Sequence, residues 1–357
     1  MRIGLLQLNA TIGAFDLNRS RLEEAYREAV DRGAELVLAP ELFLCGYPPR
    51  DLLLRGDFIQ RGLDCLNKLA GSVGEVPLIT GYVDRNPGRP GRALYNAAAV
   101  LQRGRIVHRV IKSLLPTYDV FDEDRYFEPA EKIAPIEIAG QKIALTICED
   151  IWNDADFWPE RRYRCDPVHD LVAAGAKLIV NISASPWERG KEAKRLAMLR
   201  QVSRDEKVPL VQVNMVGGND ELIFDGHSVA LNAKGELLAL GAGFVEEVLV
   251  VDMTGLSPSP AITLPASQEE QLFRALVLGV RDYVRKCNFK SAVLGLSGGI
   301  DSALVAVIAA EALGAENVWG VSLPSRYSSD GSLSDAAHLA KKLGIRYDIL
   351  PIEGPVL

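Results

Sequence analysis

The chain has 357 residues, a length that suggests two domains. Hydrophobic residues make up 48% of it and charged residues 24%, as in globular proteins with sizeable cores, and the net charge of −7 argues against a surface that coats nucleic acid. No apolar run reaches the roughly 18 residues that a membrane span needs, and the start of the chain lacks the long apolar region and cleavage site of a signal peptide.

The first 254 residues alternate short apolar runs with amphipathic stretches. Apolar residues at helical spacing predict helices, and the short apolar runs predict strands. The predicted helices cover residues 18–32, 58–71, 168–174 and 191–207. The predicted strands cover residues 3–8, 36–39, 78–82, 97–101, 106–111, 143–147, 178–182, 210–214, 228–231 and 248–252. This mixture predicts a layered α/β domain over residues 1–254.

A second domain is predicted after a change of composition. Residues 256–267 read LSPSPAITLPAS, with three prolines and no charge, which predicts an extended linker over 255–267. Beyond it, strands alternate with helices, which implies a parallel sheet. The helices are predicted at 268–287, 302–313 and 332–343, and the strands at 291–296, 318–323 and 346–350. Because this pattern is short for such a domain, we expect residues 268–357 to be the N-terminal portion of a truncated domain.

The five cysteines are few and scattered. None forms a CxxC pair or a cluster with histidine at zinc spacing. This usage favours a cytoplasmic chain with free thiols, most of them buried packing residues.

The string SGGIDS, residues 297–302, lies between a predicted strand and a predicted helix. A helix N-terminus offers unpaired N–H groups and positive potential, and two glycines let the backbone approach an anion closely. Ser297 and Ser302 add hydroxyl donors, so we interpret the string as a phosphate-binding loop. The alternative is an ordinary turn in which Ser302 caps the helix. Neither the GxxxxGK[ST] nor the GxGxxG motif occurs in the chain.

Three polar residues follow separate predicted strands in the first domain: Glu41, Lys112 and Cys148. Taken singly, each is more typical of core packing or of a surface charge. Together they suit amide hydrolysis, because a cysteine nucleophile needs a base to take its proton, and the carboxylate of Glu41 can do so. Lys112 can stabilise the oxyanion, with the backbone N–H of Glu149 as a second donor. The four histidines are interpreted as structural.

This layout resembles the nitrilase, or carbon–nitrogen hydrolase, family over residues 1–254. Proline precedes Glu41 and GY follows at 46–47, Lys112 is followed by PTY at 116–118, and Cys148 begins the string CED. The resemblance implies a four-layer α–β–β–α sandwich with a Glu-Lys-Cys triad.

Many members of that family also carry an additional glutamate after the lysine. The acids in the matching segment are Asp119, Asp122, Glu123, Asp124 and Glu128. Glu123 is the preferred candidate among them.

The second domain resembles the pyrophosphatase-type ligases that cleave ATP between its α and β phosphates. The segments LPSRYSS at 323–329 and SDAAHLAKKLG at 334–344 are similar to the NAD synthetase branch of these enzymes. The resemblance implies a partial doubly wound parallel sheet, ATP and Mg²⁺ as substrate and cofactor, and no tightly bound organic cofactor. Asp301 is the candidate for contact with Mg²⁺. The ATP-binding residues implied are Gly295, Leu296, Ser297, Gly298, Gly299, Ile300, Asp301 and Ser302.

Taken together, the two halves resemble the glutamine-dependent NAD synthetase family. By that resemblance Tyr118, Ser185 and Lys191 contact glutamine, although the segment around Ser185 and Lys191 also reads as a capped loop with a solvated lysine. Glutamine would be hydrolysed to glutamate and ammonia, and the ammonia would amidate adenylated deamido-NAD to give NAD, AMP and pyrophosphate. A homo-oligomer is expected from related folds. The alternatives are a stand-alone nitrilase-type amidase with a non-functional ligase remnant, and a catalytically silent scaffold.

Overall fold

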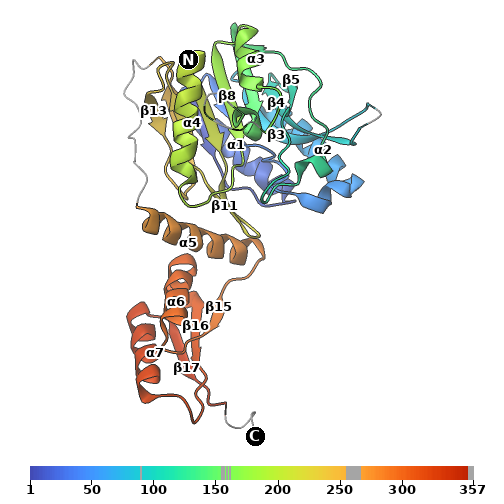
Figure 1. Ribbon diagram of the computed structural model, residues 1–357. Coiled ribbons are helices and arrows are strands. Elements are labelled where there is room, and N and C mark those ends of the chain that lie inside the picture. The colour runs from blue at the N-terminus through green and yellow to red at the C-terminus, as the bar shows by residue number, and fades with distance from the viewer. Residues whose placement is uncertain (89–90, 154–156, 158–159, 161, 255–266, 353–357) are drawn as a thin grey trace. The chain divides into compact units, whose positions relative to one another are not determined.

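The computed structural model describes residues 1–357 except 89–90, 154–156, 158–159, 161, 255–266 and 353–357 (Figure 1). The chain divides into two compact units. The first comprises Met1–Gly217 with Phe224–Ala266, and the second comprises Gly218–Ile223 with Ser267–Leu357. Among the described helices, none combines the length and the apolar character that crossing a membrane would require.

Two six-stranded sheets form the centre of the first unit. One has the order β14 (Glu247–Asp252), β1 (Arg2–Gln7), β2 (Leu36–Leu38), β3 (Leu78–Arg85), β4 (Leu94–Gln102) and β5 (Arg105–Ile111). The other has the order β13 (Leu237–Leu240), β12 (Val229–Leu231), β9 (Leu210–Asn214), β8 (Leu178–Ser183), β7 (Gln141–Ile147) and β6 (Ile136–Ile138). In each sheet three central strands are parallel and the outer strands are antiparallel.

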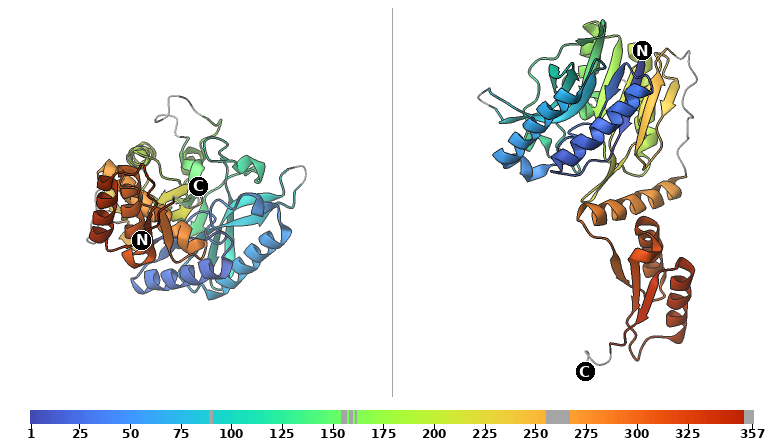
Figure 2. Two further views of the ribbon diagram at one scale, coloured as in Figure 1. Left: turned by 90° about the horizontal axis from the view of Figure 1, so that it is seen from below. Right: turned by 180° about the vertical axis from the view of Figure 1, so that it is seen from behind.

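Helices cover the outer face of each sheet. Helices α1 (Phe15–Asp31) and α2 (Gly56–Ser72) pack on the first sheet, and α3 (Pro167–Ala173) and α4 (Lys191–Glu206) pack on the second (Figures 1 and 2). The inner faces meet in a core to which both sheets contribute, including Leu5, Leu38, Ile79, Leu145 and Val180. This arrangement is the four-layer α–β–β–α sandwich, and the fold expected from the sequence is confirmed.

The sandwich explains why its central strands read as continuous apolar runs, because a strand covered on both faces has no solvent side. Four strands were not predicted: β6, β10 (Val216–Asn219), β11 (Leu222–Asp225) and β13. Each has only three or four residues, too few for a periodicity to identify them. Strands β10 and β11 form a separate two-stranded hairpin.

The second unit contains a three-stranded sheet in the order β15 (Ala292–Gly295), β16 (Val318–Ser322) and β17 (Arg346–Ile349). Its strands are parallel, as the sequence predicted. Helices α5 (Gln268–Lys286), α6 (Ile300–Leu313) and α7 (Asp330–Leu343) share a core with it, in which small residues such as Ala309 of α6 and Ala336 of α7 allow close packing. The tip of the β10–β11 hairpin also belongs to this unit, outside the limits that the sequence suggested. Short 3-10 turns lie at Arg50–Leu54, Glu123–Arg125, Cys148–Ile151 and Ala315–Asn317.

Candidate active site

Glu41, Lys112 and Cys148 come together at the carboxyl ends of strands from both sheets. Glu41 follows β2, Lys112 follows β5 and Cys148 follows β7. The Lys112 ammonium lies 2.7 Å from Glu41 Oε1, and neither side chain is exposed to solvent. Ser183 Oγ donates to Cys148 Sγ at 3.3 Å, while the adjacent backbone N–H of Ala184 donates to Glu41 Oε2 at 3.1 Å. The thiol and the carboxylate are therefore held by adjacent residues at the carboxyl end of β8.

Glu123 lies on the other side of Lys112. Both of its carboxylate oxygens are 2.8 Å from Lys112 Nζ, and Tyr47 OH donates to Oε1 at 2.8 Å. Asn96 Nδ2 donates to Glu41 at 2.8 Å and to Glu123 at 3.3 Å, so one amide ties the two acids together. The acid preferred from the sequence thus lies within the same buried cluster.

The cluster holds one ammonium between two carboxylates. Burial alone would lower the pKa of Lys112, but the negative charges of Glu123 and Glu41 outweigh it and raise that pKa well above its usual range. For Glu123, burial raises the pKa despite the opposing pull of Lys112. Lys112 is therefore charged at neutral pH and compensates the buried acids.

Cys148 occupies a sharp turn between strand and helix. It follows β7 directly, starts the short turn Cys148–Ile151 and has a backbone φ of +43°, which is uncommon for a residue with a side chain. The carboxylate of Asp150 accepts from the N–H groups of Ile147 at 2.9 Å, Ser113 at 2.9 Å and Leu114 at 2.8 Å. Asp150 therefore ties the turn that carries the thiol to the segment that follows Lys112.

The surroundings of Cys148 favour its neutral thiol over the thiolate. Burial raises the pKa of Cys148 far above its ordinary value, and the charge of Glu41 raises it further, while Lys112 and the bond from Ser183 oppose that shift. A thiol with a raised pKa needs a base within reach before it can act as a nucleophile. Glu41, whose charge acts on Cys148, is the candidate for this base.

A cavity of about 380 Å³ opens over Cys148. Tyr118, Ser185 and Lys191, the three residues predicted to contact glutamine, all line it. Lys191 Nζ donates to the carbonyl of Pro186 at 2.8 Å. The other lining residues are Asp119, Phe121, Glu149, Trp152, Asn153, Glu160, Arg162, Glu188 and Lys194.

The side chain of Glu149 was not predicted to take part. It is buried, and the hydroxyls of Tyr118 and Tyr163 donate to it at 2.9 Å and 3.0 Å. The cavity therefore offers a carboxylate from Glu149 and an ammonium from Lys191, a pair that matches the zwitterionic end of an amino acid. The place of Glu149 directly after Cys148 was the signal in the sequence; nothing in the sequence pointed to Tyr163.

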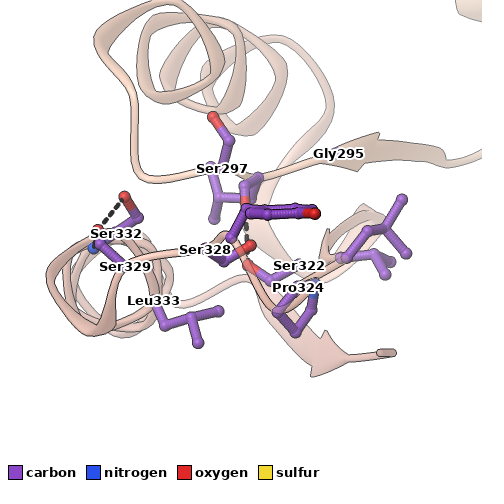
Figure 3. A pocket seen from close by; sticks show the side chains of 12 residues that line it. Gly295, Ser297, Ser322, Pro324, Ser328, Ser329, Ser332 and Leu333 are labelled. Atoms are coloured by element: carbon purple, nitrogen blue, oxygen red, sulfur yellow. Dashed lines mark hydrogen bonds between the residues drawn. The ribbon is translucent and has the colours of Figure 1, made fainter. Parts of the chain in front are cut away.

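A second cavity, of about 440 Å³, lies in the second unit at the carboxyl ends of β15 and β16. Figure 3 shows the side chains that surround it, with Ser297 on one side and Ser329 and Ser332 at the start of α7 on another. Of the eight predicted ATP-binding residues, Gly295, Leu296 and Ser297 line this cavity. The other five, residues 298–302, follow directly in the chain, and the last three of them begin α6.

Hydroxyl and backbone groups hold the SGGIDS loop together. Ser302 Oγ donates to the carbonyl of Gly299 at 3.0 Å and accepts from the N–H of Ser297 at 3.2 Å. Gly298 has φ +82°, and a Cβ there would lie 2.2 Å from the carbonyl oxygen of Ser332. The loop therefore needs glycine at 298, both for its conformation and for its approach to α7.

Asp301 is exposed in the first turn of α6. Within the described ranges, no group of three or more histidine, cysteine, aspartate or glutamate side chains is arranged to hold a metal ion. Contact between Asp301 and Mg²⁺ stays a prediction, and nucleotide phosphates and water would have to supply most ligands of the ion.

Comparison with known proteins agrees with both halves of this description. The carbon–nitrogen hydrolase family model matches residues 2–256, and the NAD synthase family model matches residues 272–357. A glutamine-dependent NAD(+) synthetase of Synechocystis sp. is 46% identical over 99% of this chain, and one of Thermotoga maritima is 42% identical over 99%. The chain spans 65% of the length of each of these relatives.

Solved structures give the same picture. A glutamine-dependent NAD+ synthetase from Acinetobacter baumannii in complex with adenosine diphosphate has a TM-score of 0.90 at 33% identity, over 99% of this chain and 65% of that chain. An amidase from Nesterenkonia sp. has a TM-score of 0.58 at 24% identity, over 71% of this chain and 89% of that one, a likeness that shows the fold alone. The resemblance stated from the sequence is confirmed. The chain belongs to the carbon–nitrogen hydrolase family, because the model of that family matches more than half of the chain's residues.

Proposed function

We propose that this chain hydrolyses glutamine at Cys148 and that the ammonia released serves the ATP-dependent amidation of deamido-NAD. The observation that carries the proposal is the cluster of Cys148, Glu41 and Lys112 beneath a cavity that also presents Glu149 and Lys191. Relatives named glutamine-dependent NAD(+) synthetase match 99% of the chain, which favours this function over that of a stand-alone amidase.

Binding of glutamine would use the charges of the cavity. Glu149 faces the α-ammonium of the substrate and Lys191 faces its α-carboxylate, while the hydroxyls of Tyr118 and Ser185 are polar contacts beside them. Two opposite charges at one end of the pocket select an α-amino acid over a simple amide. The side-chain amide then extends toward Cys148.

Hydrolysis would proceed through a thioester. Glu41 takes the proton of Cys148 as the sulfur attacks the amide carbon, and the oxyanion is stabilised by Lys112 and the N–H of Glu149. Collapse of the intermediate breaks the C–N bond, and the proton held by Glu41 leaves with the ammonia. Glu41 then accepts a proton from water, which attacks the thioester; glutamate departs and the thiol regains its proton. Glu123 keeps Lys112 charged and oriented.

The second unit would bind ATP. The Ser297–Gly298–Gly299 backbone and the start of α6 offer N–H groups to phosphates, and Asp301 is the proposed contact to Mg²⁺. The relative solved in complex with adenosine diphosphate supports nucleotide binding by this chain. There the carboxyl of deamido-NAD is adenylated with loss of pyrophosphate, and attack by ammonia yields NAD and AMP. We assign residues 1–254 to the amidase domain and 268–357 to the ligase domain, with 255–267 between them.

The test is Cys148→Ala against the matched control Cys165→Ala, which removes an exposed thiol outside the cavity. Glutamate release from glutamine should fall to background in the first variant, a loss of at least about a thousandfold, and stay at the wild-type rate in the second. Both should bind ATP as the wild type does. Glutamine hydrolysis that survives in Cys148→Ala would refute the proposal.

A further inference from the structure

The β10–β11 hairpin has a role that the proposed mechanism does not use. Phe224, near its base, is fully buried and pairs with Pro186 through an isolated β-bridge. The carbonyl of Pro186 is the one that accepts from Lys191. On its other side the ring of Phe224 meets the ring of Tyr47 edge-on at 6.0 Å, and Tyr47 donates to Glu123. Phe224 therefore contacts Pro186, which bonds to Lys191, and it also contacts Tyr47, which bonds to Glu123 of the catalytic cluster.

Asp225, the next residue, holds helix α4 in place. It is fully buried and accepts from Arg195 Nη1 at 3.1 Å and Nη2 at 2.8 Å, and its Oδ2 lies 2.8 Å from His227 Nδ1. Arg195 stands four residues after Lys191 on α4, so both side chains lie on the same face of that helix. Asp225 thus fixes the rotation and position of the helix turn that carries Lys191.

Asn214, at the end of β9, links the same carboxylate to Ser185. Its Oδ1 accepts from the N–H of Ser185 at 2.9 Å. Its Nδ2 donates to Asp225 Oδ1 at 3.2 Å and to the carbonyl of Gly226 at 2.9 Å. The positions of Ser185 and Lys191, both predicted to contact glutamine, therefore depend on buried Asp225.

We propose that the β10–β11 hairpin is a positioning element of the amidase site. Phe224 and Asp225 hold Ser185 and Lys191 in the geometry that binds glutamine. This inference rests on the proposed function and adds to it the residues that position the glutamine contacts.

The first experiment compares Asp225→Asn with Asp220→Asn, the same substitution at an exposed residue of the hairpin turn. Asp225→Asn weakens the bonds to Arg195 but leaves Cys148 and Glu41 intact, so the KM for glutamine should rise about tenfold while kcat changes by less than about threefold. Asp220→Asn should match the wild type in both. A purely structural role would instead lower the active fraction, and hence kcat, with an unchanged KM.

The second experiment acts from Asn214. Asn214→Ala removes the acceptor for the N–H of Ser185 and should raise the KM for glutamine several-fold. Asn288→Ala, at an exposed position, is the control and should keep the wild-type KM. This second pair of variants tests the inference should Asp225→Asn fail to fold. Wild-type KM values in Asn214→Ala, with an active wild-type enzyme, would overturn the inference; a wild type that releases no glutamate would instead refute the proposed function.

Discussion

The two candidate sites of this chain hold their polar groups in opposite ways. The amidase site keeps Glu41, Lys112 and Glu123 out of solvent, and each charge depends on its neighbours for compensation. The loop at residues 297–302 is largely exposed, carries a single acid, and uses hydroxyls and backbone N–H groups. A buried charged site therefore couples activity to folding stability, whereas an exposed backbone site can lose its ligand with the fold intact.

Lys112→Met should give the largest effect and tests the first half of this comparison. The substitution leaves two buried carboxylates without a cation, which should cost about 3–5 kcal/mol of unfolding free energy and abolish glutamine hydrolysis. Urea unfolding and glutamate release measure the two consequences. Lys132→Met, at an exposed position, is the control. Equal urea midpoints for Lys112→Met and wild type would show that the buried charges are not coupled to folding.

Gly298→Ala tests the second half of the comparison, the exposed loop at residues 297–302. A Cβ at this position meets the carbonyl of Ser332 and forces a residue with a side chain into φ +82°, so the loop must move. ATP binding, followed by calorimetry, should weaken by at least about tenfold, since a shift in the loop misplaces several N–H donors at once. Glutamine hydrolysis should be unchanged.

The control for that variant is Gly71→Ala in α2, where an added Cβ meets nothing within 4 Å. It should bind ATP normally and be slightly more stable, by about 0.5–1 kcal/mol. Loss of glutamine hydrolysis in Gly298→Ala would show that the two sites do not differ as described.

The smallest expected effect concerns pH. Burial works against the charge of Asp225, but Arg195 and His227 lower its pKa from 3.8 to about 2. A depressed pKa means that the unfolded chain binds the proton more tightly, so this stabilisation is complete above pH 5 and is lost as the pH falls toward 2. The stability gap between wild type and Asp225→Asn should shrink by about 1 kcal/mol between pH 7 and pH 3. A gap that stays constant in denaturant titrations would contradict the assigned charge state.

Several parts of this architecture were predictable from the sequence. The predicted positions of the long helices and core strands agree with the structure to within a few residues, because strands covered on both faces are apolar throughout and the helices are amphipathic. The SGGIDS loop could be recognised since all its groups are contiguous. Glu41, Lys112 and Cys148 each follow an apolar strand, and this shared position made them candidates.

Other features had no signal in the sequence. Tyr163 bonds to Glu149 across a separation of 14 residues, and nothing local marks Tyr163 as part of a binding pocket. The β10–β11 hairpin was missed because its strands are too short for a periodic pattern. Its importance comes from Phe224 and Asp225, whose partners lie elsewhere in the chain.

By itself, the sequence determined the alternation of strands and helices, the change of composition between the two halves and the phosphate-type loop. These features depend on local periodicity, on backbone preferences and on residues next to one another in the chain. Only the tertiary structure decided which acids surround Lys112, which charges line the cavity together and which strand supports them. The physical reason is that burial and electrostatic pairing are properties of groups brought together in space, and their separation along the chain does not encode them.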